Sequence, residues 1–174
     1  MTRRRLRAAA RLAFVSVVGP AALVLGTTTS AAAQALPRVV VRTTLGDITV
    51  EVDSVRAPIT SANFLRYVDA GAYRDGHFHR TVTPGNQPDT PVKIEVVQGG
   101  RARADAARFP PLPLERTSLT GLRHRDGTIS MARGGPDTAT SDFFFCIGDQ
   151  PSLDFGGARN PDGQGFAAFG QVVQ

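Results

Sequence analysis

The sequence predicts a mainly β domain, built as a mostly antiparallel barrel. About seven short segments are rich in Val, Ile, Thr and Phe, and several of them alternate apolar and polar side chains as half-buried strands do. Gly, Pro and Asp separate these segments, and one stretch alone has clear helical spacing. Many short strands joined by Gly/Pro-rich turns are typical of barrels and sandwiches.

The first 35 residues have the composition of a secretory signal peptide. Five arginines and no acidic residue occupy positions 1–11, an apolar run follows over 12–26, and small residues end in A-Q-A at 33–35. The apolar run is short and is broken by Gly19 and Pro20, so an uncleaved membrane anchor is the weaker alternative. We expect cleavage after Ala35, a periplasmic or secreted protein without stable membrane association, and one domain over 36–174.

The net charge of +5 arises wholly from this leader, whose five arginines equal the excess. The domain that follows is therefore neutral, and nothing in its charge indicates nucleic-acid binding. Its single cysteine, Cys146, cannot form an internal disulfide. Because it lies in the apolar run FFFCIG, we expect it to be a small buried hydrophobe.

The first expected elements are a hairpin and a helix. Two β-type runs over 39–53 surround a turn at 45–47, and a helix is expected over 59–71, after Pro58. Either Thr60 or Ser61 can cap its N-terminus, and Gly71 can end it. Its apolar positions follow helical spacing: Phe64, Leu65 and Val68.

Five more strands are expected along the rest of the chain. They cover 73–82, 91–100, 127–133, 142–148 and 166–173. In the second of these, Val92, Ile94 and Val96 fall on one face. The Pro-rich segment over 109–115 cannot be a central strand.

In this order the segments resemble the cyclophilin-type peptidyl-prolyl isomerases of the bacterial secreted kind. The resemblance runs from about Val39 to the end of the chain. It rests on T-x-x-G-D-I-x-V-E, P-I-T-S-A-N-F-L-R-Y-V, G-x-Y-x-x-x-x-F-H-R, Q-G-G, G-T-I-S-M-A-R, S-x-F-F-F, L-D and F-G-Q-V. Each motif alone is weak, but six or more in the family's order are a specific signal.

The resemblance implies an eight-stranded antiparallel barrel with one or two capping helices, and a shallow outer groove for X-Pro peptides. The family continues past F-G-Q-V-V to a closing strand, whereas this sequence stops at Gln174. We therefore expect the last strand to be missing and the first strand, 39–45, to form an exposed edge. A monomer is expected, which acts on proline-containing segments of exported proteins.

The resemblance also assigns candidate site residues. The family's essential arginine matches Arg80, the candidate catalytic residue, and no cofactor and no metal are implied. The candidate substrate-binding residues are Gln98, Val96, the strand-edge residues Ala132 and Arg133, and the pocket residues Phe144, Leu153 and Phe166.

Arginine suits this reaction for a physical reason. Amide resonance opposes rotation about an X-Pro bond by about 18–20 kcal/mol, and no covalent bond needs to break. In the twisted transition state the proline nitrogen regains its lone pair and accepts a hydrogen bond. A permanently charged donor at that point binds the transition state better than the substrate.

The H-x-H pair formed by His77 and His79 is the main alternative signal. Zinc sites need three or four protein ligands, and His124 is the only other histidine, so a metal or ligand carrier is disfavoured. In a regular strand the two histidines would share one face, with Phe78 and Arg80 on the other.

Several positions depart from the family pattern. Glu95 and Val96 replace a Phe-Met pair, Asp142 replaces a glutamine, Ser152 replaces a tryptophan or its equivalent, and Phe166 replaces a histidine. We therefore expect isomerase activity that is low or selective for the residue before proline. The alternative function is a proline-peptide-binding or chaperone module that uses the same groove with little catalysis.

Overall fold

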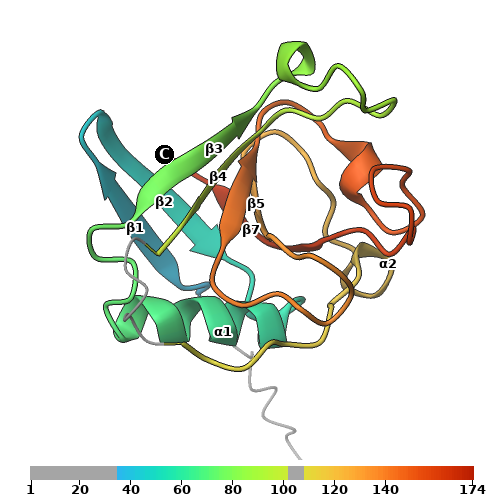
Figure 1. The fold of residues 1–174 in the computed structure, drawn as a ribbon. Coiled ribbons are helices and arrows are strands. Elements are labelled where there is room, and N and C mark those ends of the chain that lie inside the picture. The colour runs from blue at the N-terminus through green and yellow to red at the C-terminus, as the bar shows by residue number, and fades with distance from the viewer. Residues whose placement is uncertain (1–34, 102–107) are drawn as a thin grey trace, which may run out of the picture. The chain divides into compact units, whose positions relative to one another are not determined.

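The computed structural model describes residues 35–101 and 108–174, and the expected leader lies outside these ranges except for Ala35. The described residues form one curled antiparallel sheet in the order β1-β2-β7-β5-β6-β4-β3 (Figure 1). Its strands are β1 (Arg38–Thr43), β2 (Gly46–Val52), β3 (His77–Val82), β4 (Val96–Gly100), β5 (Thr128–Met131), β6 (Phe143–Cys146) and β7 (Ala167–Val172). The predicted mainly β class is confirmed.

The seven strands form a curled half-barrel. Among the described residues, β1 pairs only with β2, and β3 pairs only with β4. Strand β1 is therefore an edge strand of the described sheet, which agrees with the edge predicted for the first strand. Helix α1 (Pro58–Asp69) runs across the lower end of the curl in Figure 1, and α2 (Thr117–Thr120) is a single short turn.

A distant carboxylate caps the N-terminus of α1. Pro58 occupies the first turn, where a missing N–H costs nothing. The backbone N–H groups of Ile59 and Thr60 donate to the two carboxylate oxygens of Glu115, at 3.1 and 2.6 Å. Thr60 and Ser61 lie inside the helix and are buried. The predicted N-cap was wrong because a residue far along the chain supplies the acceptors.

The other end of α1 follows the prediction more closely. Gly71 adopts φ +63 immediately after the helix and donates its N–H to the carbonyl of Val68, as a glycine that ends a helix does. Phe64 and Tyr67 are the buried large side chains, whereas Leu65 is only half-buried. The buried face of α1 is therefore centred on Phe64 and Tyr67, and the predicted position Leu65 lies toward its margin.

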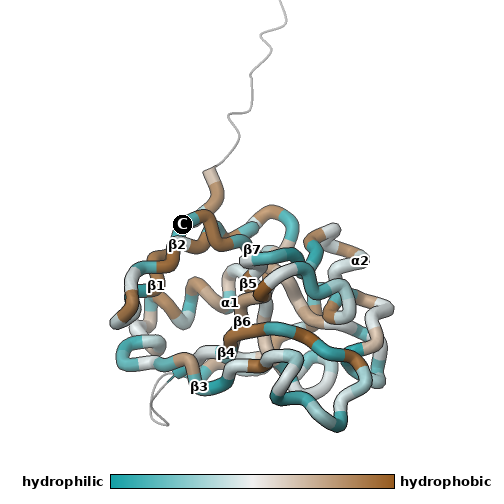
Figure 2. Tube along the Cα trace, turned by 90° about the horizontal axis from the view of Figure 1, so that it is seen from above, coloured by the Kyte–Doolittle hydropathy of each residue, from teal (hydrophilic) through white to brown (hydrophobic). Residues whose placement is uncertain are grey.

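Two apolar clusters lie on opposite faces of β6. Phe143 and Phe145 belong to the cluster inside the curl, against α1, whereas Phe144 and Cys146 belong to a second cluster on the outer face. Burial of both faces explains why this strand is an unbroken apolar run. Figure 2 shows it in mostly hydrophobic colours, in contrast to β3. Cys146 is buried as predicted, and burial raises the pKa of its thiol to about 12.

Strand β4 is shorter than the predicted strand over 91–100. The side-chain amide of Gln87 donates to the carbonyl of Ile94 at 2.7 Å and accepts from its N–H at 3.4 Å. Because the Gln87 side chain satisfies the backbone groups of Ile94, this residue does not join the sheet ladder.

Across the described residues, no helix is both long and apolar enough to cross a bilayer.

Replacement of Glu115 with alanine is expected to lower the free energy of unfolding by about 1 kcal/mol, the usual cost of losing an N-cap acceptor. Urea denaturation at neutral pH measures this difference. Glu95→Ala is the matched control, because no hydrogen bond or ion pair of the Glu95 side chain is present among the described residues. Equal losses in the two variants would contradict the capping role of Glu115.

Candidate functional site

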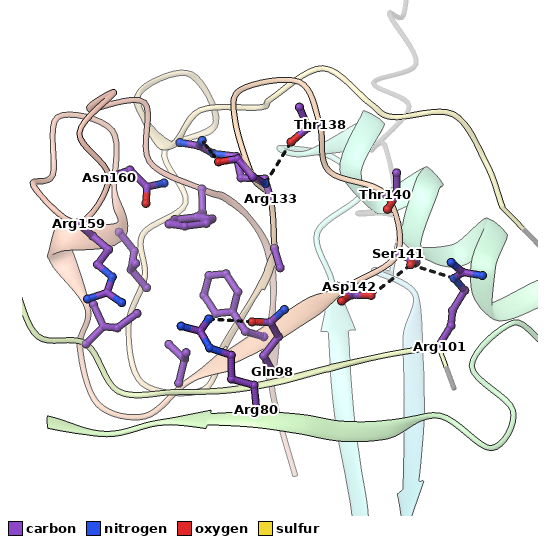
Figure 3. Close-up of a pocket in the computed structure, with 17 residues that line it drawn as sticks. Arg80, Gln98, Arg101, Arg133, Thr138, Thr140, Ser141, Asp142, Arg159 and Asn160 are labelled. Carbon is purple, nitrogen blue, oxygen red and sulfur yellow. Dashed lines mark hydrogen bonds between the residues drawn. The ribbon is translucent and has the colours of Figure 1, made fainter. Parts of the chain in front are cut away.

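One pocket on the outer face of the sheet contains every site residue that the sequence predicted. Its lining also includes further residues, most of them polar, that no sequence motif indicated. The predicted members are Arg80, Val96, Gln98, Ala132, Arg133, Phe144, Leu153 and Phe166. The others are Ile94, Arg101, Gly134, Thr138, Thr140, Ser141, Asp142, Arg159 and Asn160. Figure 3 shows the polar members around the rim.

A β-bulge at His79 directs Arg80 toward this pocket. Phe78 pairs with Gly99, and Arg80 pairs with the next residue back, Gln98, so His79 is the extra residue. Phe78 therefore lies on the inner face, where a Cβ at position 99 would come within 2.9 Å of its ring. Arg80 lies on the outer face and donates from Nη1 to Gln98 Oε1 at 3.1 Å. The expectation that Phe78 and Arg80 share a face was wrong, because the bulge breaks the alternation.

Strand register places Arg80 in a row with the apolar wall. Arg80 pairs with Gln98 across β3 and β4, Gln98 with Phe144 across β4 and β6, and Phe144 with Ser130 across β6 and β5. Residues paired in this way lie on the same face of a sheet. The candidate donor and the candidate proline wall are therefore neighbours across one strand.

The apolar part of the pocket is built mainly from aromatic and branched side chains. The rings of Phe144 and Phe166 meet edge to face, with centroids 5.4 Å apart. Leu153 and Val96 pack in the same outer cluster, and so does Ile94, which the sequence analysis did not assign to the site. Its alternation with Val96 was the signal that could have found it. Glu95, which departs from the family pattern, is not part of the lining.

A buried polar network supports this wall from behind. His124 Nδ1 lies 2.8 Å from Asp154 Oδ1, and its Nε2 lies 2.9 Å from Ser130 Oγ. The imidazole stacks on the Phe144 ring, with centroids 6.1 Å apart and an angle of 15°. Ser130 is fully buried and is not part of the pocket lining, so this Ser-His-Asp arrangement positions Phe144 and presents no nucleophile.

Asp154 has a perturbed pKa because of this network. Burial alone would raise the pKa of its carboxyl, but hydrogen bonds from the side chain and backbone of His124 outweigh burial and hold it below its ordinary value. Nearby Arg123, whose Nη1 lies 3.4 Å from Oδ2, acts in the same direction. The ionised carboxylate is therefore the form that the fold stabilises.

Arg133 is engaged within the protein. Its guanidinium donates to both carboxylate oxygens of Asp162, at 2.8 and 3.0 Å, and to the Gly165 carbonyl at 2.8 Å. It also lies over the Phe166 ring, with the guanidinium carbon 5.0 Å from the centroid. The hydrogen bonds from Arg133, followed by that from the backbone N–H of Gln164, hold the pKa of Asp162 below its ordinary value. The Arg133 side chain thus orients the Phe166 loop.

The two ends of the pocket differ in their polar groups. Arg159 and Asn160 lie at one side in Figure 3, Asp142, Ser141 and Arg101 lie at the opposite side, and Arg80 lies between them. At the second end, Arg101 Nε donates to Ser141 Oγ at 3.0 Å. No local pattern indicates either end, because these residues come together only through the fold.

The two histidines of the H-x-H pair lie beside the pocket. Their rings are 5.7 Å apart, and His79 Nε2 lies 3.6 Å from Asp142 Oδ2. Across residues 35–101 and 108–174, no group of three or more His, Cys, Asp or Glu side chains could hold a metal ion. The carboxylate neighbour gives His79 an interaction that needs no metal.

Comparisons with known proteins agree on one family. The model for cyclophilin type peptidyl-prolyl cis-trans isomerases matches residues 38–174. "Peptidyl-prolyl cis-trans isomerase A" of Dickeya dadantii is 37% identical over 147 residues, which cover 82% of this chain and 69% of the relative. "Peptidyl-prolyl cis-trans isomerase cyp18" of Streptomyces antibioticus is 33% identical, with 76% and 74% covered.

The fold has a counterpart among solved structures. A crystal structure of a Cryptosporidium parvum cyclophilin type peptidyl-prolyl cis-trans isomerase, determined in the presence of the dipeptide Ala-Pro, aligns with a TM-score of 0.61. The alignment covers 79% of each chain at 22% identity, which supports the fold assignment alone.

Replacement of Asp154 with asparagine is expected to make stability less dependent on acid pH. The folded pKa of Asp154 lies below the unfolded value of about 3.9, so its ionised form stabilises the fold above that value. This stabilisation is lost as the pH falls through the folded pKa. The gap in unfolding free energy between wild type and Asp154→Asn should therefore be widest near pH 7 and should narrow below about pH 4.

Urea denaturation over a pH series measures this gap. Asp47→Asn is the matched control, because Asp47 is exposed on β2 and its substitution should leave the pH dependence unchanged. A gap between wild type and Asp154→Asn that stays constant from pH 7 to pH 3 would contradict the assigned pKa direction.

Proposed function

This chain belongs to the cyclophilin-type peptidyl-prolyl cis-trans isomerases, and from that membership we propose that its outer pocket accelerates X-Pro rotation with Arg80 as the transition-state donor. The observation that carries this proposal is the shared pocket of Arg80, Phe144 and Leu153. A cation held beside an apolar wall is what the reaction needs, since the proline ring must stay fixed while its nitrogen gains a lone pair.

Arg80 has the geometry of a fixed donor. Gln98 Oε1 accepts a hydrogen bond from Nη1 and thereby orients the planar guanidinium over the pocket. The guanidinium has further N–H groups that a twisted X-Pro amide can use. The guanidinium of arginine is also a planar, permanently charged donor. It contributes selectively to the rate because the proline nitrogen accepts a hydrogen bond only when it is pyramidal.

The apolar wall holds the other half of the substrate. Phe144, Phe166 and Leu153 would contact the pyrrolidine ring, and Ala132 would hold the peptide backbone. The N–H of Ala132 already donates to the Asp142 carbonyl at 2.8 Å and is not available to a peptide, so we assign the backbone contact to the strand edge formed by Ala132 and Arg133 as a whole. No covalent intermediate is needed, because the reaction is a bond rotation.

We also propose that the enzyme acts on proline-containing segments of exported proteins, after residues 1–35 direct it out of the cytoplasm. The leader-like composition of these residues supports export. The relative whose structure was determined in the presence of Ala-Pro supports proline peptides as ligands of this fold.

Replacement of Arg80 with alanine is expected to lower kcat/KM for isomerisation about 10²–10³-fold, the usual effect of removing one preorganised transition-state donor. NMR exchange spectroscopy on an X-Pro peptide measures the interconversion without an auxiliary protease. Arg42→Ala, an exposed arginine on β1 outside the pocket, is the matched control and should retain wild-type activity.

The same measurements separate catalysis from binding. A catalytic Arg80 predicts a large loss of rate with a much smaller change in peptide Kd. A wild-type protein that binds the peptide without accelerating its exchange would overturn the proposal and favour the proline-peptide-binding module instead.

Expression of the full chain in a bacterial host is expected to yield a secreted or periplasmic product that begins at Leu36. Mass spectrometry of the intact product identifies its first residue. A product that retains residues 1–35 and sediments with membranes would instead support the uncleaved anchor.

A further inference from the structure

Among the residues that the structure describes, four arginines and one carboxylate line the pocket, although the domain as a whole is neutral. Arg133 is paired with Asp162, and Arg101 lies at the same end as Asp142, the acidic residue of the described lining. Arg80 and Arg159 differ from these two. Among the residues that the structure describes, neither has a carboxylate within ion-pair distance.

Arg159 is held at the pocket by neutral acceptors. Its Nη1 donates to Gln87 Oε1 and to the Val92 carbonyl, each at 2.7 Å. These partners belong to the segment between β3 and β4, whereas Arg159 belongs to the segment between Leu153 and β7. Both hydrogen bonds come from Nη1, so these two acceptors do not use the N–H groups on Nε and Nη2 of the guanidinium.

Arg159 and Arg80 affect each other electrostatically. The pKa of Arg159 is lowered, first by its burial and then by the positive charge of Arg80. Two like charges in one partly buried pocket repel each other, and an anion between them or beside Arg159 relieves the repulsion. The rigid planar head of arginine also matches the two oxygens of a carboxylate.

We propose that Arg159 selects substrates in which an acidic residue lies directly before or directly after the proline. This inference rests on the proposed isomerase function and adds a substrate class to it. The proline ring would occupy the wall formed by Phe144 and Leu153, and a neighbouring Asp or Glu carboxylate would pair with Arg159. The opposite end of the pocket carries the carboxylate of Asp142, which would repel an acidic side chain, so we assign no such preference to it.

A peptide is favoured over a free anion by the composition of the pocket. The lining combines the cations with a continuous apolar wall that inorganic phosphate or sulfate would leave uncovered. A segment that carries a proline beside a carboxylate would cover both. The neutral charge of the domain beyond the leader gives no broad field for nucleic acid, so the recognition is local.

The test uses matched peptides with Glu or Gln at the position before or after a single proline. We expect kcat/KM for at least one Glu peptide to exceed that of its Gln counterpart about three- to tenfold at low salt, the range for a partly exposed ion pair. NMR exchange gives the rates, and NMR titration gives the Kd values. The Glu/Gln ratio should fall toward one at 0.5 M salt because ions screen the pair.

Variants of Arg159 distinguish charge recognition from support of the neighbouring segment. Arg159→Gln should bring the Glu/Gln ratio to about one, whereas Arg159→Lys, which keeps the charge but changes the hydrogen-bonding geometry, should retain most of the preference. Arg42→Gln removes the same charge outside the pocket and should leave both the ratio and the activity at wild-type values.

The outcomes separate this inference from the proposed function. Acceleration of Gln and Glu peptides to the same extent, at both positions, would overturn the acidic preference and leave the isomerase function intact. A protein that accelerates none of the peptides would refute the isomerase function, and the ratio of Kd values would then decide whether Arg159 recognises acidic segments. A preference for Glu peptides that persists in Arg159→Gln would show that another cation causes it, and would overturn the role proposed for Arg159.

Discussion

The register of the sheet across β3, β4, β6 and β5 is the constraint on which the site depends. It places Arg80, Gln98, Phe144 and Ser130 in one row on the outer face. The bulge at His79 is what admits Arg80 to that row, since without it Phe78 and Arg80 would share a face. A single register shift would move the donor to the inside of the curl, away from the apolar wall.

Polar groups with satisfied hydrogen bonds support the outer wall from behind. His124 connects Asp154 to Ser130 and stacks on Phe144, so the ring that faces the pocket is supported by hydrogen bonds rather than by apolar packing alone. Each partner is buried, and a missing member would leave an unsatisfied polar group. Asp154 of this network directly follows Leu153, so one polar cluster supports two parts of the apolar wall.

Two loops add charged groups to the ends of this pocket. The segment before β4 and the segment before β7 meet through Arg159, and Asp162 in the latter segment orients Arg133 over Phe166. The sheet thus supplies Arg80 and the apolar wall, while the loops supply Arg159 at one end. Under the two proposals above, the reaction and the choice of substrate are carried by separate parts of the fold.

The sequence by itself determined the strand segments, the end of α1 at Gly71, the burial of Cys146 and, through motif order, which residues gather in the pocket. These features are local: periodicity, turn residues and short motifs are readable within a few positions. Only the tertiary structure decided the Glu115 cap, the bulge at His79 and the place of Arg159. Each of these depends on the pairing of distant segments, where a carboxylate, an extra strand residue or a guanidinium meets partners that no local pattern specifies.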